Sequence, residues 1–137
     1  MGTCITFEHI ERDADRTLGV VLLAKTTPST LYCAFLIRRV AGGLNGFVND
    51  CTPEFIQGLS ETQADALKKR LQEIHAKLTL LCSRDLGSVR FLAGPISRLE
   101  KSQEDLGDII EELALIHDKD FKSLLKDAAS SLGLSAR

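Results

Sequence analysis

The clearest pattern in the chain is a stripe of apolar residues in its second half. Five residues follow one another at steps of four, three, four and three, and we call them the leucine stripe: Leu67, Leu71, Ile74, Leu78 and Leu81. This is the spacing of one face of an α-helix. Ser60 and Gln63 have the spacing of a capping box, in which the two side chains bond backbone N–H groups of the first turn. The pattern predicts a helix of about six turns over residues 61–82.

A second helical pattern follows after a break at residues 83–94. Within the break, residues 89–92 are compatible with a short helix, a buried strand or a packed loop. Pro95 suits the first turn of the next helix, because it lacks only an N–H that would be unpaired there. Ser102 and Asp105 could mark a further helix start, so one bent helix and two helices in series both stay open. Helical spacing continues as far as His117 through six residues: Leu99, Leu106, Ile109, Ile110, Leu113 and Ile116.

A last helix is predicted after His117. Asp118 is interpreted as its N-cap, and Gly133 as its stop signal. The turn at residues 117–118 is too short for a linker, so we expect a hairpin of two packed helices. The apolar positions of this helix are Phe121, Leu124, Leu125, Ala128 and Leu132.

The first sixty residues fit two interpretations. As helices, they show a three–four stripe made of Phe7, Ile10, Ala14, Thr17, Val21 and Ala24. Thr27-Pro28 and Thr52-Pro53 then resemble an N-cap followed by proline at the first helical position, and Gly42-Gly43 would end the second helix. As strands, residues 17–25 and 31–40 would form a hairpin, which their β-branched and aromatic residues favour. The two Thr-Pro pairs lead us to prefer helices.

These elements predict an all-α fold, a compact bundle of five or six helices, as a single domain over residues 1–137. The alternative is α+β, with an N-terminal β-hairpin packed by C-terminal helices. Composition supports the first, because 44% of the 137 residues are hydrophobic but only 5% are aromatic. A leucine-rich, aromatic-poor chain favours helices packed on helices.

Charge and cysteine usage narrow the function classes. A net charge of −2 argues against a dedicated nucleic-acid binder. No apolar run approaches the roughly 20 residues of a membrane span, and acidic residues stand where an export signal would need apolar ones. We therefore expect a cytoplasmic protein with neither nucleic acid nor membrane as partner. The four cysteines are isolated from one another, at positions 4, 33, 51 and 82, which predicts reduced thiols and no zinc site.

Arg70 and His75 are similar to the R-x4-H motif of HEPN-type ribonucleases, which are small helical proteins that often dimerise. The resemblance implies that the arginine would stabilise phosphate charge while the histidine transfers a proton. Five residues turn a helix by about 140°, so the two side chains would converge only across a dimer axis. We prefer to interpret both as solvated residues beside the leucine stripe, because a two-residue match has little specificity.

Residues 104–108, Glu-Asp-Leu-Gly-Asp, resemble the Glu-Glu-Leu-Gly-Asp segment of MazG-like nucleoside triphosphate pyrophosphatases, which are all-helical oligomeric enzymes. The resemblance implies that Asp105 and Asp108 would hold Mg²⁺ from one helix face. Asp stands where that family has a metal-binding Glu, and its second Glu-x-x-Glu pair has no counterpart in residues 61–101. We therefore expect no metal site, no catalytic residue and no cofactor.

The carboxylates of this segment form a candidate binding surface, which we call the acidic face: Glu104, Asp105, Asp108, Glu111 and Glu112. Like charges four residues apart on a helix repel by a few tenths of a kcal/mol. Either a basic protein partner or the last helix, with Lys119, Lys122 and Lys126, would relieve that repulsion, and we prefer the intramolecular explanation. The leucine stripe is the second candidate surface, covered either by the same chain or by a partner helix. Gly42–Gly46 lacks the Lys-Ser/Thr of a phosphate-binding loop.

Our leading hypothesis is a non-enzymatic helical protein–protein interaction module. It would act as an adaptor, an antitoxin- or immunity-type partner, or an assembly subunit. Its partner would be another protein or a second copy of the chain in a homodimer. The alternative is a small helical enzyme on phosphate substrates, either a Mg²⁺-dependent nucleotide pyrophosphatase or a metal-independent ribonuclease.

Overall fold

The computed structural model describes residues 5–84 and 92–131, and every regular element in these ranges is an α-helix. In chain order they are α1 (Phe7–Thr26), α2 (Thr30–Asp50), α3 (Pro53–Gln57), α4 (Glu61–Cys82) and α5 (Ala93–Ser131). The all-α prediction is confirmed, with five helices in the described part of the chain. The alternative N-terminal β-hairpin is wrong, because residues 17–25 and 31–40 lie within α1 and α2.

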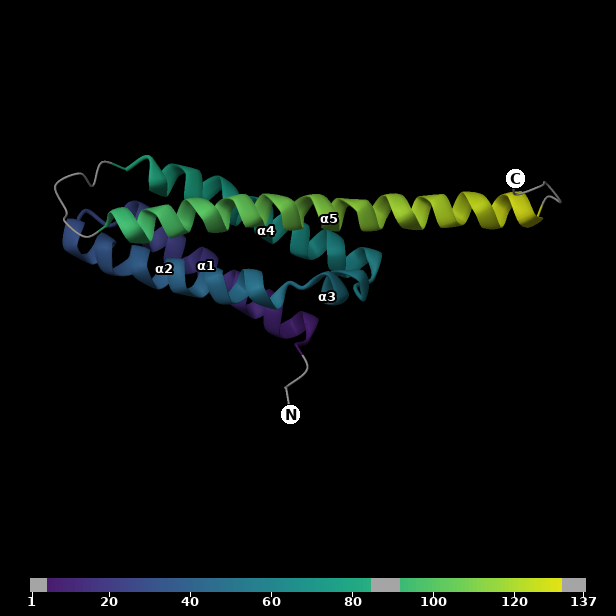
Figure 1. Cartoon of the computed structure of the whole chain (residues 1–137), viewed down its shortest axis with the longest axis horizontal. Helices are drawn as coiled ribbons and strands as arrows, with labels where there is room; N and C mark the ends of the chain where they lie inside the picture. The colour runs from purple at the N-terminus through teal and green to yellow at the C-terminus, as the bar shows by residue number, and fades with distance from the viewer. Residues whose placement is uncertain (1–4, 85–91, 132–137) are drawn as a thin grey trace.

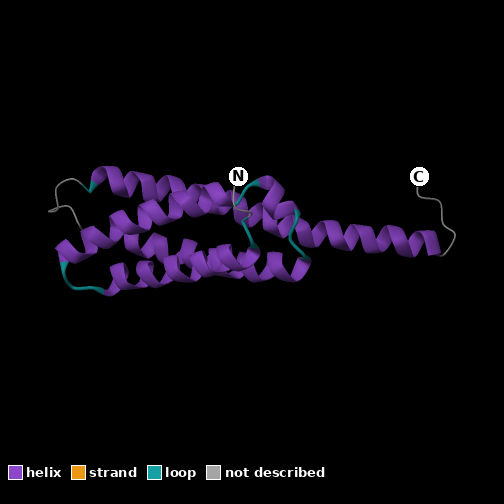
Figure 2. Ribbon diagram, turned by 90° about the horizontal axis from the view of Figure 1, so that it is seen from below, coloured by secondary structure: helices purple, strands orange, loops and turns teal. Residues whose placement is uncertain are grey.

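The four long helices form a bundle in which each helix has two neighbours. α1 packs against α2 and α4, and α5 packs against the same two helices. Figures 1 and 2 show α1 and α4 running towards one end of the bundle and α2 and α5 towards the other. The neighbours α1 and α4 are therefore parallel, and the chain passes from α2 to α4 across the end of the bundle through α3. No described helix is long and apolar enough to cross a membrane.

The N-terminal stripe is buried as predicted, at Ile10, Ala14, Thr17, Val21 and Ala24. The boundary between α1 and α2 differs from the prediction. Thr27 ends α1, and Ser29 is the N-cap of α2, where its hydroxyl accepts a 3.2 Å hydrogen bond from Tyr32 N–H. The physical reason is Pro28, which disfavours helical dihedrals at the residue before it. Thr27 is accordingly extended, and α2 starts two residues after the proline.

Gly42 and Gly43 do not end α2, which continues to Asp50. Each glycine costs about 1 kcal/mol relative to alanine in a helix interior. Burial of the residues before and after the two glycines outweighs that cost. Four of these neighbours are at most 4% exposed: Val40, Ala41, Leu44 and Phe47. The second Thr-Pro prediction is confirmed, because Thr52 caps α3 and the following proline occupies its first turn.

α4 agrees with its prediction at both ends and along its face. The capping box is present, with Ser60 N–H bonded to Gln63 Oε1 and Gln63 N–H bonded to Ser60 Oγ, both at 3.1 Å. All five residues of the leucine stripe are at most 1% exposed, between α1 and α5. Local capping and tertiary burial therefore select the same helix.

α5 is one continuous helix of 39 residues. Pro95 lies in its first turn, as predicted. No new helix begins at Ser102, whose side chain is buried. The predicted hairpin at His117–Asp118 is wrong, and Asp118 is not an N-cap: no glycine or proline interrupts the backbone there, so the i to i−4 hydrogen bonds continue. Residues 89–91, for which a short helix, a buried strand and a packed loop all stay open, lie outside the described residues, and so does Gly133, the expected stop signal of the last helix.

The continuity of α5 gives the molecule its shape. A helix of 39 residues is about 58 Å long, whereas the 22 residues of α4 span about 33 Å. The bundle ends where α4 begins, and α5 projects beyond it (Figures 1 and 2). Ile116 is the last residue of α5 in the buried core of the described chain. We call residues 117–131 the α5 extension.

Leu71→Ala tests the contribution of the leucine stripe to stability. The truncation leaves a cavity in the core, so we expect the free energy of unfolding to fall by about 2 to 5 kcal/mol. Leu80→Ala is the matched control on the same helix, since Leu80 is 50% exposed, and its effect should stay within about 0.5 kcal/mol. Urea denaturation measures both, and equal losses would contradict the assignment of the core.

The described cysteines are free thiols, with Cys33 and Cys51 buried and Cys82 partly exposed. Burial raises the pKa of all three, and for Cys51 burial together with the Asp50 carboxylate raises the pKa to about 12. Because the thiolate is the reactive form, we expect a disulfide reagent at pH 8 to label Cys82 before Cys33 and Cys51. Peptide mapping with and without urea measures this order. Early labelling of Cys51 in the folded protein would contradict it.

Candidate functional site

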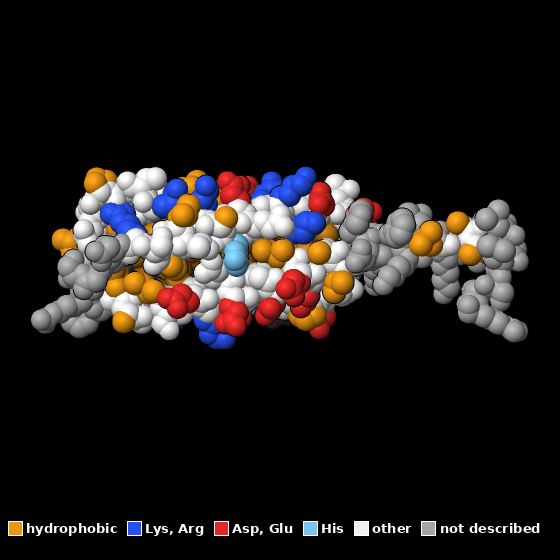
Figure 3. All heavy atoms as spheres, turned by 90° about the horizontal axis from the view of Figure 1, so that it is seen from above, with side chains coloured by type: hydrophobic (Ala, Val, Ile, Leu, Met, Phe, Trp, Pro, Cys, Tyr) orange, Lys and Arg blue, Asp and Glu red, His pale blue; other side chains and the backbone are white. Residues whose placement is uncertain are grey.

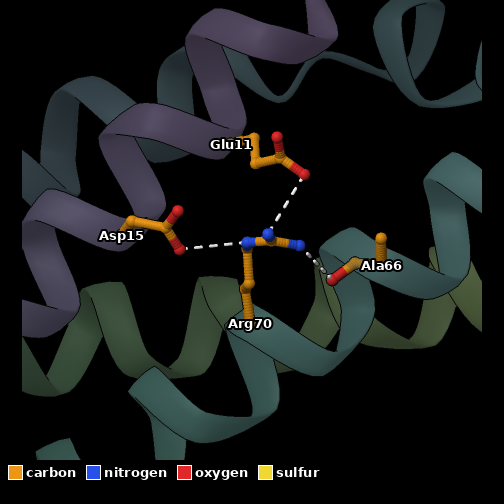
Figure 4. Close-up of polar contacts among 4 residues, drawn as sticks. All are labelled: Glu11, Asp15, Ala66 and Arg70. Atoms are coloured by element: carbon orange, nitrogen blue, oxygen red, sulfur yellow. Dashed lines mark hydrogen bonds and ion pairs between the residues drawn. The ribbon is translucent and has the colours of Figure 1, made fainter.

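Arg70 joins α4 to α1 through a partly exposed cluster of charged side chains. Its Nη2 lies 3.1 Å from Glu11 Oε2 and its Nε lies 3.0 Å from Asp15 Oδ1, while Nη1 donates to the carbonyl of Ala66 at 3.2 Å (Figure 4). The guanidinium is thus held between two carboxylates that neutralise it. This arrangement positions α1 against α4 and leaves little positive charge for a phosphate.

His75, the second residue of the ribonuclease-like pair, lies where α4 contacts α5. The backbone carbonyl of His75 accepts a 3.2 Å hydrogen bond from Gln103 Nε2 of α5, which also donates to Thr79 Oγ1 at 2.6 Å. Among the described residues, no hydrogen bond or ion pair joins His75 to Arg70. Within one chain, the structure therefore does not bring the two together.

Arg70→Met tests this link between helices. The substitution keeps most of the aliphatic volume but removes the charge that faces Glu11 and Asp15, so we expect the free energy of unfolding to fall by about 1 kcal/mol. Lys69→Met is the control, because the one ion pair of Lys69 within the described residues is with the exposed Asp65, at 3.4 Å. The loss should exceed the control at low salt and shrink at high salt. Equal effects of the two variants would contradict the role given to Arg70.

The acidic face lies on the part of α5 that belongs to the bundle. Glu104, Asp108 and Glu111 are exposed, and Asp105 and Glu112 are partly buried. Figure 3 shows acidic side chains gathered along one edge of the bundle. No ion pair to any of these five carboxylates occurs within the described residues. This part of α5 therefore carries negative charge that the described chain does not neutralise.

The predicted intramolecular relief of this charge is wrong. It required the helix with Lys119, Lys122 and Lys126 to fold back beside the acidic face. Because α5 runs without a turn to Ser131, the segment with these lysines continues along the same axis, away from the acidic face. The last segment of α5 therefore does not fold back to relieve the charge of the acidic face.

The two residues of the pyrophosphatase-like motif do not belong to a larger ligand cluster. Among the described residues, no group of three or more His, Cys, Asp or Glu could hold a metal ion. A shallow hollow between α2 and α5 contains Asp105, and it is also lined by Arg98 and Lys101. These two cations oppose the binding of Mg²⁺ at Asp105.

Sequence reasoning missed an apolar surface on α2. Leu31 is 80% exposed, Phe35 is 55% exposed and Tyr32 is 45% exposed. The run of residues 31–37 looks like one continuous apolar segment, but on a helix Leu31 and Phe35 point away from the buried Cys33 and Ile37. The sequence does carry this signal, because the helical period places Leu31 and Phe35 on the side opposite the apolar residues that are buried.

Comparisons with models of protein families, with curated proteins and with solved structures found no match. Two surfaces of the bundle stand apart from its core: α5 with its acidic face and extension, and the exposed side of α2. The leucine stripe is not among them, because the chain's own helices bury it.

Proposed function

We propose that this protein is a non-enzymatic protein–protein interaction module and that α5 is its docking helix. The observation that carries the proposal is the length of α5, 39 residues, against 20 to 22 in the three other long helices of the bundle. Its last part has no neighbouring element in the described chain (Figures 1 and 2). Adaptors, antitoxin- or immunity-type proteins and assembly subunits all belong to this class.

The physical chemistry of the α5 extension supports this role. Isolated helices shorter than about 12 to 15 residues are marginal in water, and most helical stability in proteins comes from packing one apolar face. The sequence places Phe121, Leu124, Leu125 and Ala128 at i, i+3, i+4 and i+7 of the extension. Leu125 is 55% exposed. A partner that covers this face would stabilise the helix and bind through it.

The acidic face indicates what kind of protein would dock. Leu115, which is 62% exposed, follows Glu111 by one helical turn and extends the line of Glu104 and Asp108. A basic surface on the partner would gain orientation and association rate from the carboxylates. Apolar side chains at Leu115 and along the α5 extension would supply most of the affinity. We infer a cytoplasmic setting, which the free thiols of the described cysteines support.

Charge reversal on the acidic face tests the proposal. Partners are captured with the tagged chain from cells of its source and identified by mass spectrometry. The purified complex is then measured by calorimetry. The triple variant Glu104→Lys, Asp108→Lys, Glu112→Lys should abolish binding, because it replaces attraction of a basic partner by repulsion. Leu125→Asp should weaken it about tenfold or more by removing an apolar anchor.

The matched control reverses three exposed carboxylates on other helices: Glu8, Glu54 and Glu73, each to Lys. It changes the net charge of the chain by the same amount but leaves α5 intact, so binding should persist. A partner that binds the acidic-face variant as tightly as the control would overturn the assignment of α5. Circular dichroism of all variants confirms that the bundle is folded.

A further inference from the structure

The exposed side of α2 combines two large apolar residues with a hollow. Leu31 is 80% exposed and Phe35 is 55% exposed, one helical turn apart. The ring of Tyr32 stacks on that of Phe35, with centroids 6.4 Å apart and an interplanar angle of 13°, so the two rings support each other. Large apolar side chains that project together from a surface typically mark an interaction site.

The hollow begins about two turns further along α2 and has a volume of about 250 Å³. It lies between α1 and α2. Three glycines of α2 line it, Gly42, Gly43 and Gly46, together with Phe47 and Asp50 of the same helix and Asp13, Arg16 and Thr17 of α1. A Cβ atom at Gly42 or Gly46 would meet nothing within 4 Å. Packing inside the chain therefore does not require these glycines, although each weakens the helix relative to alanine. Their absent side chains leave room for a group from outside.

The exposed pair Leu31 and Phe35 and the glycine pair Gly42 and Gly46 occupy symmetric positions along α2. At 100° per residue, Leu31, Phe35, Gly42 and Gly46 fall within a sector of about 60° on the outward side of the helix. Leu31 and Phe35 are four residues apart, and so are Gly42 and Gly46. The midpoint between Leu31 and Gly46 is also the midpoint between Phe35 and Gly42. Each projecting residue thus has a glycine at the mirrored position.

We propose that α2 pairs with α2 of a second copy of this chain, antiparallel, about a twofold axis between residues 38 and 39. In this register Leu31 of each copy lies over Gly46 of the other, and Phe35 lies over Gly42. Such an isologous contact closes as a dimer. Glycines on a helix surface let a second helix approach closely and leave room for its projecting side chains. The contact spans residues 31–46, about 24 Å of helix.

The charges near the axis give the dimer a characteristic salt dependence. Arg38 and Arg39 are exposed, and neither has an ion pair within the described residues. The proposed register brings the four arginines of two copies near one another, and salt screens their repulsion. The dimer is therefore tighter at 0.5 M than at about 0.05 M salt, opposite to a dimer held by ion pairs.

Sedimentation equilibrium at several protein concentrations, in reducing buffer, tests the pairing. The wild type should approach twice its chain mass of 15.0 kDa. Gly42→Leu should fill the hollow and raise the dimer dissociation constant about tenfold or more, while the melting temperature of the monomer does not fall. Phe35→Ala removes the opposite partner and should act in the same direction. Gly19→Leu is the matched control, an exposed glycine inside α1 with nothing within 4 Å of its Cβ position, and should keep the dimer.

Cross-linking tests the orientation of the two helices, at a protein concentration high enough to offset the loss of the Phe35 contact. In the double variant Phe35→Cys, Gly42→Cys the two thiols are about 10 Å apart along one helix, too far for a disulfide within the chain. Mild oxidation should produce a covalent dimer of this variant and much less with either single variant or the wild type.

Three results would overturn the pairing through α2. They are a monomeric wild type at all concentrations and salts, a dimer that survives Gly42→Leu, and a dimer lost with Leu125→Asp while Gly42→Leu retains it. The last result would assign self-association to the α5 extension. The docking function proposed for α5 is tested on a different helix with a different readout, so either proposal can fail while the other stands.

Discussion

The bundle depends on covering both sides of the leucine stripe on α4. This face is fully buried only because α1 lies on one side and α5 on the other. With α1 parallel to α4, the chain has to cross the end of the bundle after α2, and α3 occupies that crossing. Arg70 then fixes α1 against α4 through two carboxylates of α1. The leucine stripe therefore sets the order in which the helices pack. The guanidinium of Arg70 then holds α1 and α4 in one relative position.

Burial of that face also sets the limit of the core. α4 begins at Glu61, and beyond the level of its first turn α5 has no partner helix. The backbone of α5 continues nonetheless, because no residue at the edge of the bundle ends a helix. The result is a helix whose first part packs in the core and whose last part has no neighbouring helix in the described chain. The acidic face on the same helix, unneutralised by the described residues, gives such contacts a preferred charge.

α2 differs from α5, because it lies within the bundle along its whole length and yet exposes large apolar residues. Its inward side is apolar enough to carry the helix through three glycines, each unfavourable in a helix. Its outward side combines exposed Leu31 and Phe35 with the open surface that those glycines leave. The two proposed interactions therefore use different helices and different chemistry. The contact on α2 relies on complementary shape, and the contact on α5 relies on charge and apolar anchors. A chain of this kind could self-associate and bind a partner at the same time.

Local pattern determined which segments are helical and where several of them begin. The leucine stripe, the Ser60 capping box and the Thr52-Pro53 start were all readable, because periodicity and caps act within a few residues. Tertiary structure decided whether the helices continue through Gly42-Gly43 and through His117-Asp118. At the glycines this depends on the burial of the residues before and after them, and at His117-Asp118 it depends on whether the chain turns back into a hairpin. It also decided which apolar residues are core and which, like Leu31 and Phe35, are surface. The acidic face was visible in the sequence, but its lack of a partner in the described chain followed only from the straight path of α5.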